Sequence, residues 1–254
     1  MKARILGSGT SSGVPRIGND WGECDPTEPR NRRTRASLLV EHGSTRILID
    51  TSPDMRAQLL AADVGTVDAV IWTHEHADHV FGIDDLRQIF HARGQPIPGY
   101  ARSETRAGLT EKFAYIFNGH HGYPPVVTLA NLPDRLAIGS ITVNAVDQPH
   151  ASISSAGLRF TANGKSIGYA TDLSAMTEPM RALYAGLDAW IVDALRRRPH
   201  PSHPHLARVV DWVQELSPQK TALIHMDQSM DYRGLLAELP PGIEPGYDGM
   251  EIVV

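Results

Sequence analysis

Five titratable side chains crowd into seven consecutive residues, THEHADH at positions 73–79. The segment holds three of the chain's twelve histidines and follows the apolar run Val70-Ile71-Trp72 directly. Imidazoles and carboxylates are costly to bury together unless a cation or paired charges compensate them. A solvated surface turn is the alternative interpretation, but the crowding favours a metal site.

The spacing in this segment differs from the HExxH motif of a helix, because the residue four positions after His74 is Asp78. In an extended segment His74, His76 and Asp78 would alternate onto one side. His79 would then turn the chain into the following helix. The pattern His-x-His-x-Asp-His therefore offers four ligands from one loop, and two neighbouring metals could share them.

Three further donors stand at or near the ends of predicted strands, namely His150, Asp172 and His225. Each alone is a weak signal, since histidine and aspartate at strand ends are commonly caps or turn residues. Together with the opening loop they provide five imidazoles and two carboxylates, without any thiolate. That mixture of nitrogen and oxygen donors suits Zn, Mn or Fe.

The elements that must position these donors alternate along the chain. Short β-branched runs bounded by Gly, Pro, Asp or Asn predict strands at Ala3–Leu6, Ser37–Val40, Arg46–Ile49, Ala69–Trp72, Val126–Leu129, Ile141–Val146, Ala156–Thr161, Ser166–Ala170, Ala189–Val192, Thr221–Ile224 and Met250–Val253. Helices are predicted at Pro53–Ala62, Asp84–His91, Glu104–Phe117, Glu178–Tyr184 and His205–Leu216. This alternation favours a layered α/β sandwich over an all-β barrel. Without a repeat or a linker, residues 1–254 are predicted to form a single domain.

The bulk composition excludes several classes of protein. The 254 residues carry a formal net charge of -5, so no global basic field points to nucleic acid or to an anionic membrane. One cysteine, Cys24, cannot form an internal disulfide. No apolar stretch reaches the length of a membrane span, and no signal peptide is evident. We therefore expect a cytoplasmic protein without a membrane partner.

At these residues the chain resembles the metallo-β-lactamase superfamily, through THEHADH, His150, the ATD that ends at Asp172, and LIHMD with His225. The resemblance implies an αββα four-layer sandwich with a two-metal site at one edge. It assigns the metal ligands in three sets: His74, His76 and His150 for one metal, Asp78, His79 and His225 for the other, and Asp172 as the bridge. The implied cofactors are two divalent ions, Zn or Mn.

A closer likeness is to the phosphodiesterase branch of that superfamily, which includes the phosphoribosyl 1,2-cyclic phosphate phosphodiesterases and is related to the nuclease that trims tRNA 3′ ends. The segments that carry it are LGSGTSSGVP (6–15), PRNRRTRASLLV (29–40), LIDTSPDMR (48–56), GIDDLR (82–87) and GYDGMEI (246–252). RPHPSHPHL (198–206) is similar to an extra histidine motif of these enzymes, which implies a general acid at His203. His200 and His205 are its neighbours.

Two departures from that branch matter. Members often carry a Cys-rich structural zinc site after GVP, whereas here that loop offers only Cys24, and Gln228 replaces the histidine that would complete the site. A structural zinc is therefore not expected. The chain is also too short for the long arm with which the nuclease binds tRNA. This makes a tRNA-processing function a less favoured hypothesis.

The predicted function is a dinuclear metal-dependent phosphodiesterase that acts on small cyclic phosphodiesters, such as phosphoribosyl cyclic phosphate or cyclic nucleotides. Two metals would supply hydroxide at neutral pH and neutralise the developing charge, with Asp78 and Asp172 in the catalytic centre and His203 protonating the leaving group. The alternatives are a thioester or lactone hydrolase of the same fold, a small nuclease, and a binding module that has lost catalysis. Nucleic acid is expected as a ligand only in the form of a small nucleotide. For the oligomeric state, a homodimer is one alternative.

Several other residues have less specific functional interpretations. Asp50 and Asp193, each closing a strand, are candidates to orient a ligand or an acid histidine, with a strand-end cap as the alternative. The Gly7–Gly13 loop either presents backbone N–H groups to an anion or turns tightly for steric reasons. In FNGHHGYPP (117–125), Tyr123 is a candidate to stack on a base and His120 or His121 to touch phosphate, with a plain surface loop as the alternative.

Overall fold

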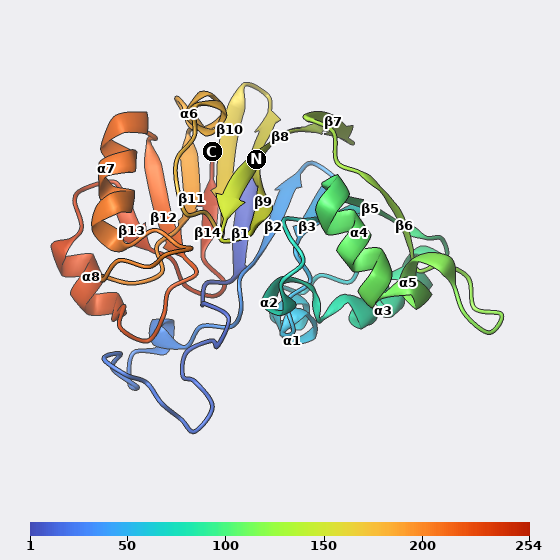
Figure 1. The fold of residues 1–254 in the computed structure, drawn as a ribbon, viewed down its shortest axis with the longest axis horizontal. Coiled ribbons are helices and arrows are strands. Elements are labelled where there is room, and N and C mark those ends of the chain that lie inside the picture. The colour runs from blue at the N-terminus through green and yellow to red at the C-terminus, as the bar shows by residue number, and fades with distance from the viewer.

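The computed structural model describes residues 1–254 and contains two seven-stranded sheets (Figure 1). The first sheet has the order β14 (Glu251–Val253), β1 (Lys2–Gly7), β2 (Ser37–His42), β3 (Thr45–Ile49), β4 (Ala69–Trp72), β5 (Ile97–Ala101), β6 (Val127–Asn131). The second has the order β13 (Ile243–Pro245), β12 (Lys220–Ile224), β11 (Ala189–Asp193), β10 (Lys165–Ala170), β9 (Ile153–Ala162), β8 (Ile141–His150), β7 (Arg135–Ile138).

Helices cover the outer face of each sheet, as Figure 1 shows. Beside the first sheet lie α1 (Met55–Ala61), α2 (Ala77–Val80), α3 (Leu86–Arg93), α4 (Ser103–Lys112) and α5 (Ala114–Asn118). Beside the second lie α6 (Glu178–Tyr184), α7 (Leu206–Leu216) and α8 (Tyr232–Glu238), and short 3₁₀ turns occupy Pro29–Asn31 and Ile83–Asp85. None of these helices combines the length and the apolarity that crossing a membrane requires.

Three separate apolar clusters define four layers. The central cluster of 23 buried residues joins the facing sides of both sheets, and it includes Ile5, Phe160 and Tyr169. Each outer cluster contains 18 buried residues and lies between one sheet and its own helices. Strands buried on both faces need continuous apolar runs, as in β4, whose four residues are all buried. The predicted αββα four-layer sandwich is confirmed.

Parallel pairing brings the important strand ends to one edge. In the first sheet β3 pairs in parallel with β4, and in the second β11 pairs in parallel with both β10 and β12. The residues that follow these strands therefore lie at the carboxyl ends of the two sheets. The sheets approach each other there, because Gly9 bridges Met226 and the backbone N–H of Ala156 donates to Thr73 O at 2.8 Å. This edge carries every candidate metal ligand.

A long loop between β1 and β2 is held by a buried guanidinium. Arg33 is 2% exposed, and its Nη2 donates to Met230 O at 2.6 Å while Nη1 lies 3.3 Å from Asp227 O and 3.7 Å from Cys24 Sγ. Burial lowers the pKa of Arg33, and the neighbouring acidic groups only partly offset this effect. The side chain therefore ties the loop to the segment after β12.

Replacing Arg33 with methionine is expected to lower the free energy of unfolding by about 2–4 kcal/mol, because buried acceptors would lose a charged donor. Chemical denaturation measures this loss. Arg32→Met is the matched control, since Arg32 is exposed and lies 5.1 Å from the Trp21 ring; its loss should stay below about 1 kcal/mol. Equal losses in both variants would contradict this role for Arg33.

Candidate metal centre

The structure brings the seven candidate ligands together in two groups around one carboxylate. His74, His76 and His150 form the first group with Asp172, with all ligand atoms within 4.8 Å of one another. His150 Nε2 lies 3.2 Å from His76 Nδ1 and 3.4 Å from Asp172 Oδ1. His74 Nε2 lies 3.7 Å from the same oxygen. One oxygen of Asp172 therefore faces three imidazole nitrogens.

The second group contains Asp78, His79 and His225 and faces the other oxygen of Asp172. His79 Nε2 lies 3.2 Å from Asp172 Oδ2 and 3.4 Å from Asp78 Oδ2. His225 Nε2 lies 3.5 Å and 3.4 Å from the same two oxygens. Asp172 thus divides its oxygens between the groups, which is the arrangement of a bridging carboxylate.

The donor set fits divalent cations in two respects. Metal–ligand bonds of about 2.0–2.1 Å in a tetrahedron place neighbouring donor atoms about 3.3–3.4 Å apart, close to the separations within each group. The Nε2 atoms of His74 and His79 are buried and have no hydrogen-bond partner in the chain. An orphaned buried nitrogen is costly unless something binds its lone pair. The cluster is therefore suited to bind divalent metal.

Backbone strain concentrates at this edge. Asp50, Asp172 and His225 lie one or two residues after the ends of β3, β10 and β12 and adopt positive φ angles of 62°, 55° and 56°. Aspartate and histidine tolerate the left-handed region better than most residues, although it still costs about 1 kcal/mol or more. Strain of this kind is typical of functional sites. Here it turns each side chain from the end of its strand toward the cluster.

One local prediction is wrong. The segment is extended only as far as His76, which precedes α2, so Asp78 does not continue an alternating strand but lies with His79 in a helical turn. Tertiary hydrogen bonds hold this turn, since Thr51 N donates to His79 O and Gly82 N donates to Thr51 O. A four-residue helix has no stability of its own, so packing decides its conformation. The helical turn carries Asp78 and His79 to the second group.

Neighbouring groups orient the candidate ligands. His79 Nδ1 donates to Asp50 Oδ2 at 2.8 Å, which leaves the Nε2 lone pair free, and Thr73 donates to both oxygens of Asp50. His150 Nδ1 donates to Ser202 O at 3.1 Å. The contacts made by Thr73 and by the backbone carbonyl of Ser202 were not foreseen, because neither group carries a distinctive spacing signal in the sequence. Glu75 pairs with Lys112 at 2.9 Å and takes no part in either group.

The protonation of the cluster is set by its charges. Burial opposes a charge on His225, but Asp172 and the hydrogen bond with Asp78 raise the pKa of His225 to about 9. Burial likewise opposes ionisation of Asp172, but His225, His79 and His74 hold the pKa of that carboxyl well below its usual range. The carboxylates therefore stay ionised because positive charge lies next to them. Bound divalent cations would supply more of this charge than the imidazoles do.

Asp50→Asn is expected to weaken metal binding about 10- to 100-fold, because an amide has one acceptor oxygen for the three donors that now share two. Competition with a chelator measures the affinity. Asp63→Asn is the matched control, since Asp63 also has a positive φ, of 53°, but belongs to neither ligand group. Unchanged affinity in Asp50→Asn would show that the contact with His79 does not tune the metals.

His203 stands beside the metal ligands on the loop after β11. Its Nδ1 lies 2.7 Å from Asp193 Oδ2, and its Nε2 lies 3.8 Å from Asp172 Oδ1. Its ring stacks on that of His225 at 4.9 Å between centroids. Asp193 thus fixes the ring and leaves Nε2 facing the cluster. Asp172, His203 and His225 also form a third possible ligand group, so the position suits either a proton donor or a ligand.

A polar cavity adjoins the second group. It measures about 620 Å³, and Asp78 lies in its wall together with Arg16, Arg35 and Ser12. Arg35 pairs with Asp54 at 2.9 Å and Arg16 pairs with Asp20. In the Gly7–Gly13 loop, the N–H groups of Gly9, Thr10 and Gly13 bond backbone carbonyls, so the loop is tied into the fold. Two guanidiniums therefore border the approach to Asp78.

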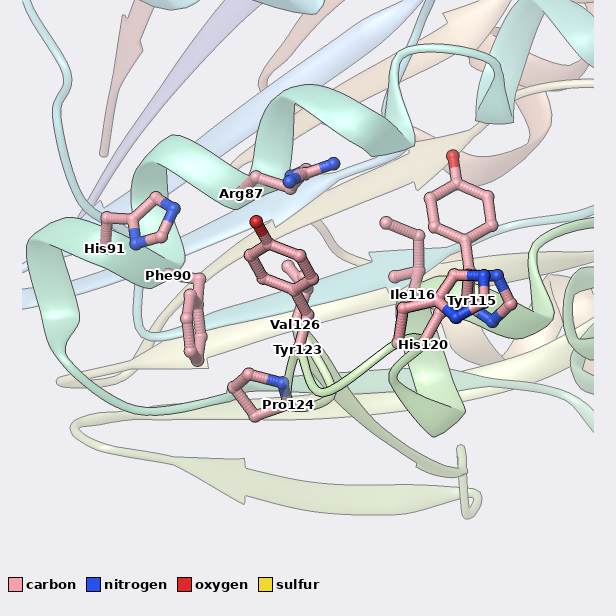
Figure 2. Close-up of a pocket in the computed structure, with 10 residues that line it drawn as sticks. Arg87, Phe90, His91, Tyr115, Ile116, His120, Tyr123, Pro124 and Val126 are labelled. Atoms are coloured by element: carbon pink, nitrogen blue, oxygen red, sulfur yellow. The ribbon is translucent and has the colours of Figure 1, made fainter.

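The candidate residues His120, His121 and Tyr123 do not join this cluster. They line a different cavity, between α3 and α5 (Figure 2).

Comparisons with known proteins agree with the αββα fold. A family model described as beta-lactamase superfamily domain matches residues 45–226. The crystal structure of a new diphosphatase from the PhnP family is similar, with TM-score 0.90 and 33% identity over 99% of this chain and 97% of that one. Zn²⁺-bound PqqB from Methylobacterium extorquens shares the fold, with TM-score 0.80 and 19% identity over 100% of both chains.

Among curated proteins, an octanoyltransferase from Porphyromonas gingivalis is 32% identical over 260 residues. The match covers 100% of this chain and 52% of that protein, so the chain spans about half the length of this relative.

Proposed function

The chain belongs to the metallo-β-lactamase superfamily of hydrolases, and from this membership we propose that it is a phosphodiesterase acting on small, cyclic phosphodiesters with two divalent metals, Zn or Mn. The proposal assigns one metal to His74, His76 and His150 and the other to Asp78, His79 and His225, with Asp172 shared. When bound, such metals lower the pKa of water and neutralise charge on a phosphoryl group.

The observation that carries the proposal is the pairing of Asp172 with His203 at one site. Asp172 offers one oxygen to each donor group, and the Nε2 of His203 lies 3.8 Å from Oδ1. A cyclic phosphodiester releases an alkoxide, which needs a proton as its P–O bond breaks. His203, held through Nδ1 by Asp193, is placed to supply that proton from Nε2.

Guanidiniums near the approach also support a phosphate substrate. Arg16 and Arg35 border the cavity next to Asp78, each beside a carboxylate partner, Asp20 or Asp54, that a phosphate group would have to displace or share. A guanidinium matches the geometry of phosphate oxygens and attracts an anion. A thioester or lactone is neutral at its reacting centre in the ground state, so these two side chains favour it less than a phosphodiester, which is already anionic.

A second candidate is hydrolysis of a diphosphate linkage, which is favoured by the likeness to the diphosphatase of the PhnP family. The same metals and arginines suit both reactions. A phosphate leaving group is a weaker base than an alkoxide and needs less help from an acid. The Asp193–His203 pair therefore favours the phosphodiester.

A turnover panel with the metal-loaded protein tests the proposal. We expect cleavage of 2′,3′-cyclic nucleotides and of bis-p-nitrophenyl phosphate, with little turnover of a lactone or a glutathione thioester. Cleavage of a nucleoside diphosphate alone would select the second candidate. If the phosphate esters stay intact while the lactone or thioester is cleaved, phosphodiester chemistry is excluded.

A further inference from the structure

A second cavity lies away from the metal centre, between α3, α5 and the loop 119–126. We call it the α3–α5 cavity (Figure 2). It measures about 290 Å³, near the lower end for small-ligand pockets. Its floor is apolar, formed by the buried side chains of Ile116 and Val126. None of the candidate metal ligands lines it.

Aromatic rings form the walls of this cavity. Tyr123 is 69% exposed and Tyr115 is 41% exposed, although large rings usually bury most of their surface. In Figure 2 Tyr123 rises from the loop toward Arg87, with Phe90 and Pro124 beside it. Exposed rings around an apolar floor offer flat faces on which a planar ring can stack.

The polar part of the lining contains one guanidinium and three imidazoles. Arg87, His91, His120 and His121 line the cavity, and no carboxylate does. The carboxylate nearest to the Arg87 guanidinium is that of Asp84, 3.9 Å away and partly solvated, so a stronger anion can engage the guanidinium. In a chain with a net charge of -5, a rim with a guanidinium, several N–H donors and no carboxylate favours a ligand that carries a negative charge.

The loop that carries Tyr123 is a built structure. His120 N donates to Tyr123 O and Tyr123 N donates to His120 O, which closes a two-residue turn. Both central residues, His121 and Gly122, have positive φ angles of 47° and 84°, as type I′ turns require. Histidine pays a conformational cost there that asparagine or glycine would largely avoid. The turn fixes Tyr123 and sets both imidazoles at the rim of the cavity.

From the stacking faces, the Arg87 guanidinium at the rim and the volume, we propose that the α3–α5 cavity binds a free nucleoside monophosphate. The base stacks against Tyr123 over the apolar floor, and the phosphate pairs with Arg87 and the rim histidines. The cavity holds about one nucleotide, so a longer strand gains no further contact inside it. This site is separate from the proposed phosphodiester chemistry and does not depend on it.

Isothermal titration calorimetry with AMP tests the proposal on the full, metal-loaded chain. We expect one AMP per chain at this site, weakened about 5- to 150-fold by Tyr123→Ala and comparably by Arg87→Gln. Arg56→Gln, an exposed arginine on α1, is the matched control and should bind as the unmodified chain does. Adenosine and ribose 5-phosphate, which each lack one half of the ligand, should bind at least tenfold more weakly than AMP.

The variant Asp172→Asn separates this cavity from the metal centre, where a phosphate can also bind. AMP binding that persists in Asp172→Asn and is lost in Tyr123→Ala supports the proposal. Binding that disappears in Asp172→Asn, or that is unchanged by Tyr123→Ala, overturns it. An oligonucleotide that binds Asp172→Asn more tightly than AMP would assign the cavity to single-stranded nucleic acid and also overturn it.

Discussion

Asp172→Asn is expected to lose both metals and to lower turnover by about 10³-fold or more. Each oxygen of Asp172 faces a different donor group, at 3.4 Å from His150 Nε2 on one side and 3.2 Å from His79 Nε2 on the other. An amide keeps the shape but replaces one oxygen with an NH₂ group that cannot bind a cation. Since the two proposed metals would supply several kcal/mol of transition-state stabilisation, their loss should dominate the kinetics.

Elemental analysis of the purified protein and steady-state turnover measure the two effects together. Asp188→Asn is the control, because Asp188 is also a buried strand-end carboxylate but bonds Ser166 and Lys165 outside the cluster. It should keep both metals and normal turnover. If Asp172→Asn retained two metals, or lost only one, the shared role of this carboxylate would be wrong.

The grouping of the ligands could be anticipated from sequence, whereas their local conformation could not. The structure places His74 and His76 with His150, and Asp78 and His79 with His225, as the resemblance implies. The resemblance supplies this division into two sets, whereas the residues themselves indicate only that the donors stand at or near strand ends, which share one edge. The helical turn at Asp78 was missed because only tertiary contacts stabilise it.

Strands with unfavourable composition were missed for a similar reason. β5 contains Pro98 and Gly99, residue types that are depleted in strands. A side chain at Gly99 would meet Val127 at 2.5 Å and Trp72 at 2.8 Å, so close packing requires glycine there. The predicted helix Glu104–Phe117 is divided at Phe113, whose φ of -129° ends α4 before α5 begins. No periodicity in the sequence marks either feature.

Three neighbouring histidines show that sequence spacing alone cannot identify the proton donor. His200, His203 and His205 lie within six residues, and only the resemblance singles out His203. In the structure Asp193 lies 2.7 Å from His203, whereas His205 directly precedes α7. His200 contacts Ser202 instead. A carboxylate ten residues upstream makes the distinction. The sequence names Asp193 as a candidate to orient an acid histidine, and the position of the loop after β11 decides between that role and a strand-end cap.

His203→Ala is expected to lower kcat by about 10²- to 10⁴-fold on a cyclic phosphodiester, the range for removal of a general acid. The metal content should stay that of the unmodified chain, because each proposed ligand group is complete without His203. His205→Ala is the matched control, since it removes the same side chain two residues away without touching the cluster. It should leave both kcat and metal content unchanged.

Substrates with different leaving groups distinguish two possible roles of His203, proton donor and metal ligand. An alkoxide leaving from a 2′,3′-cyclic nucleotide needs a proton, whereas p-nitrophenolate is a much weaker base and leaves without one. If His203 donates the proton, His203→Ala should impair the cyclic nucleotide far more than bis-p-nitrophenyl phosphate. A ligand would instead produce equal losses on both substrates, together with loss of metal. That outcome would remove His203 from the proton-transfer step and, with it, the preference for an alkoxide leaving group over a diphosphate.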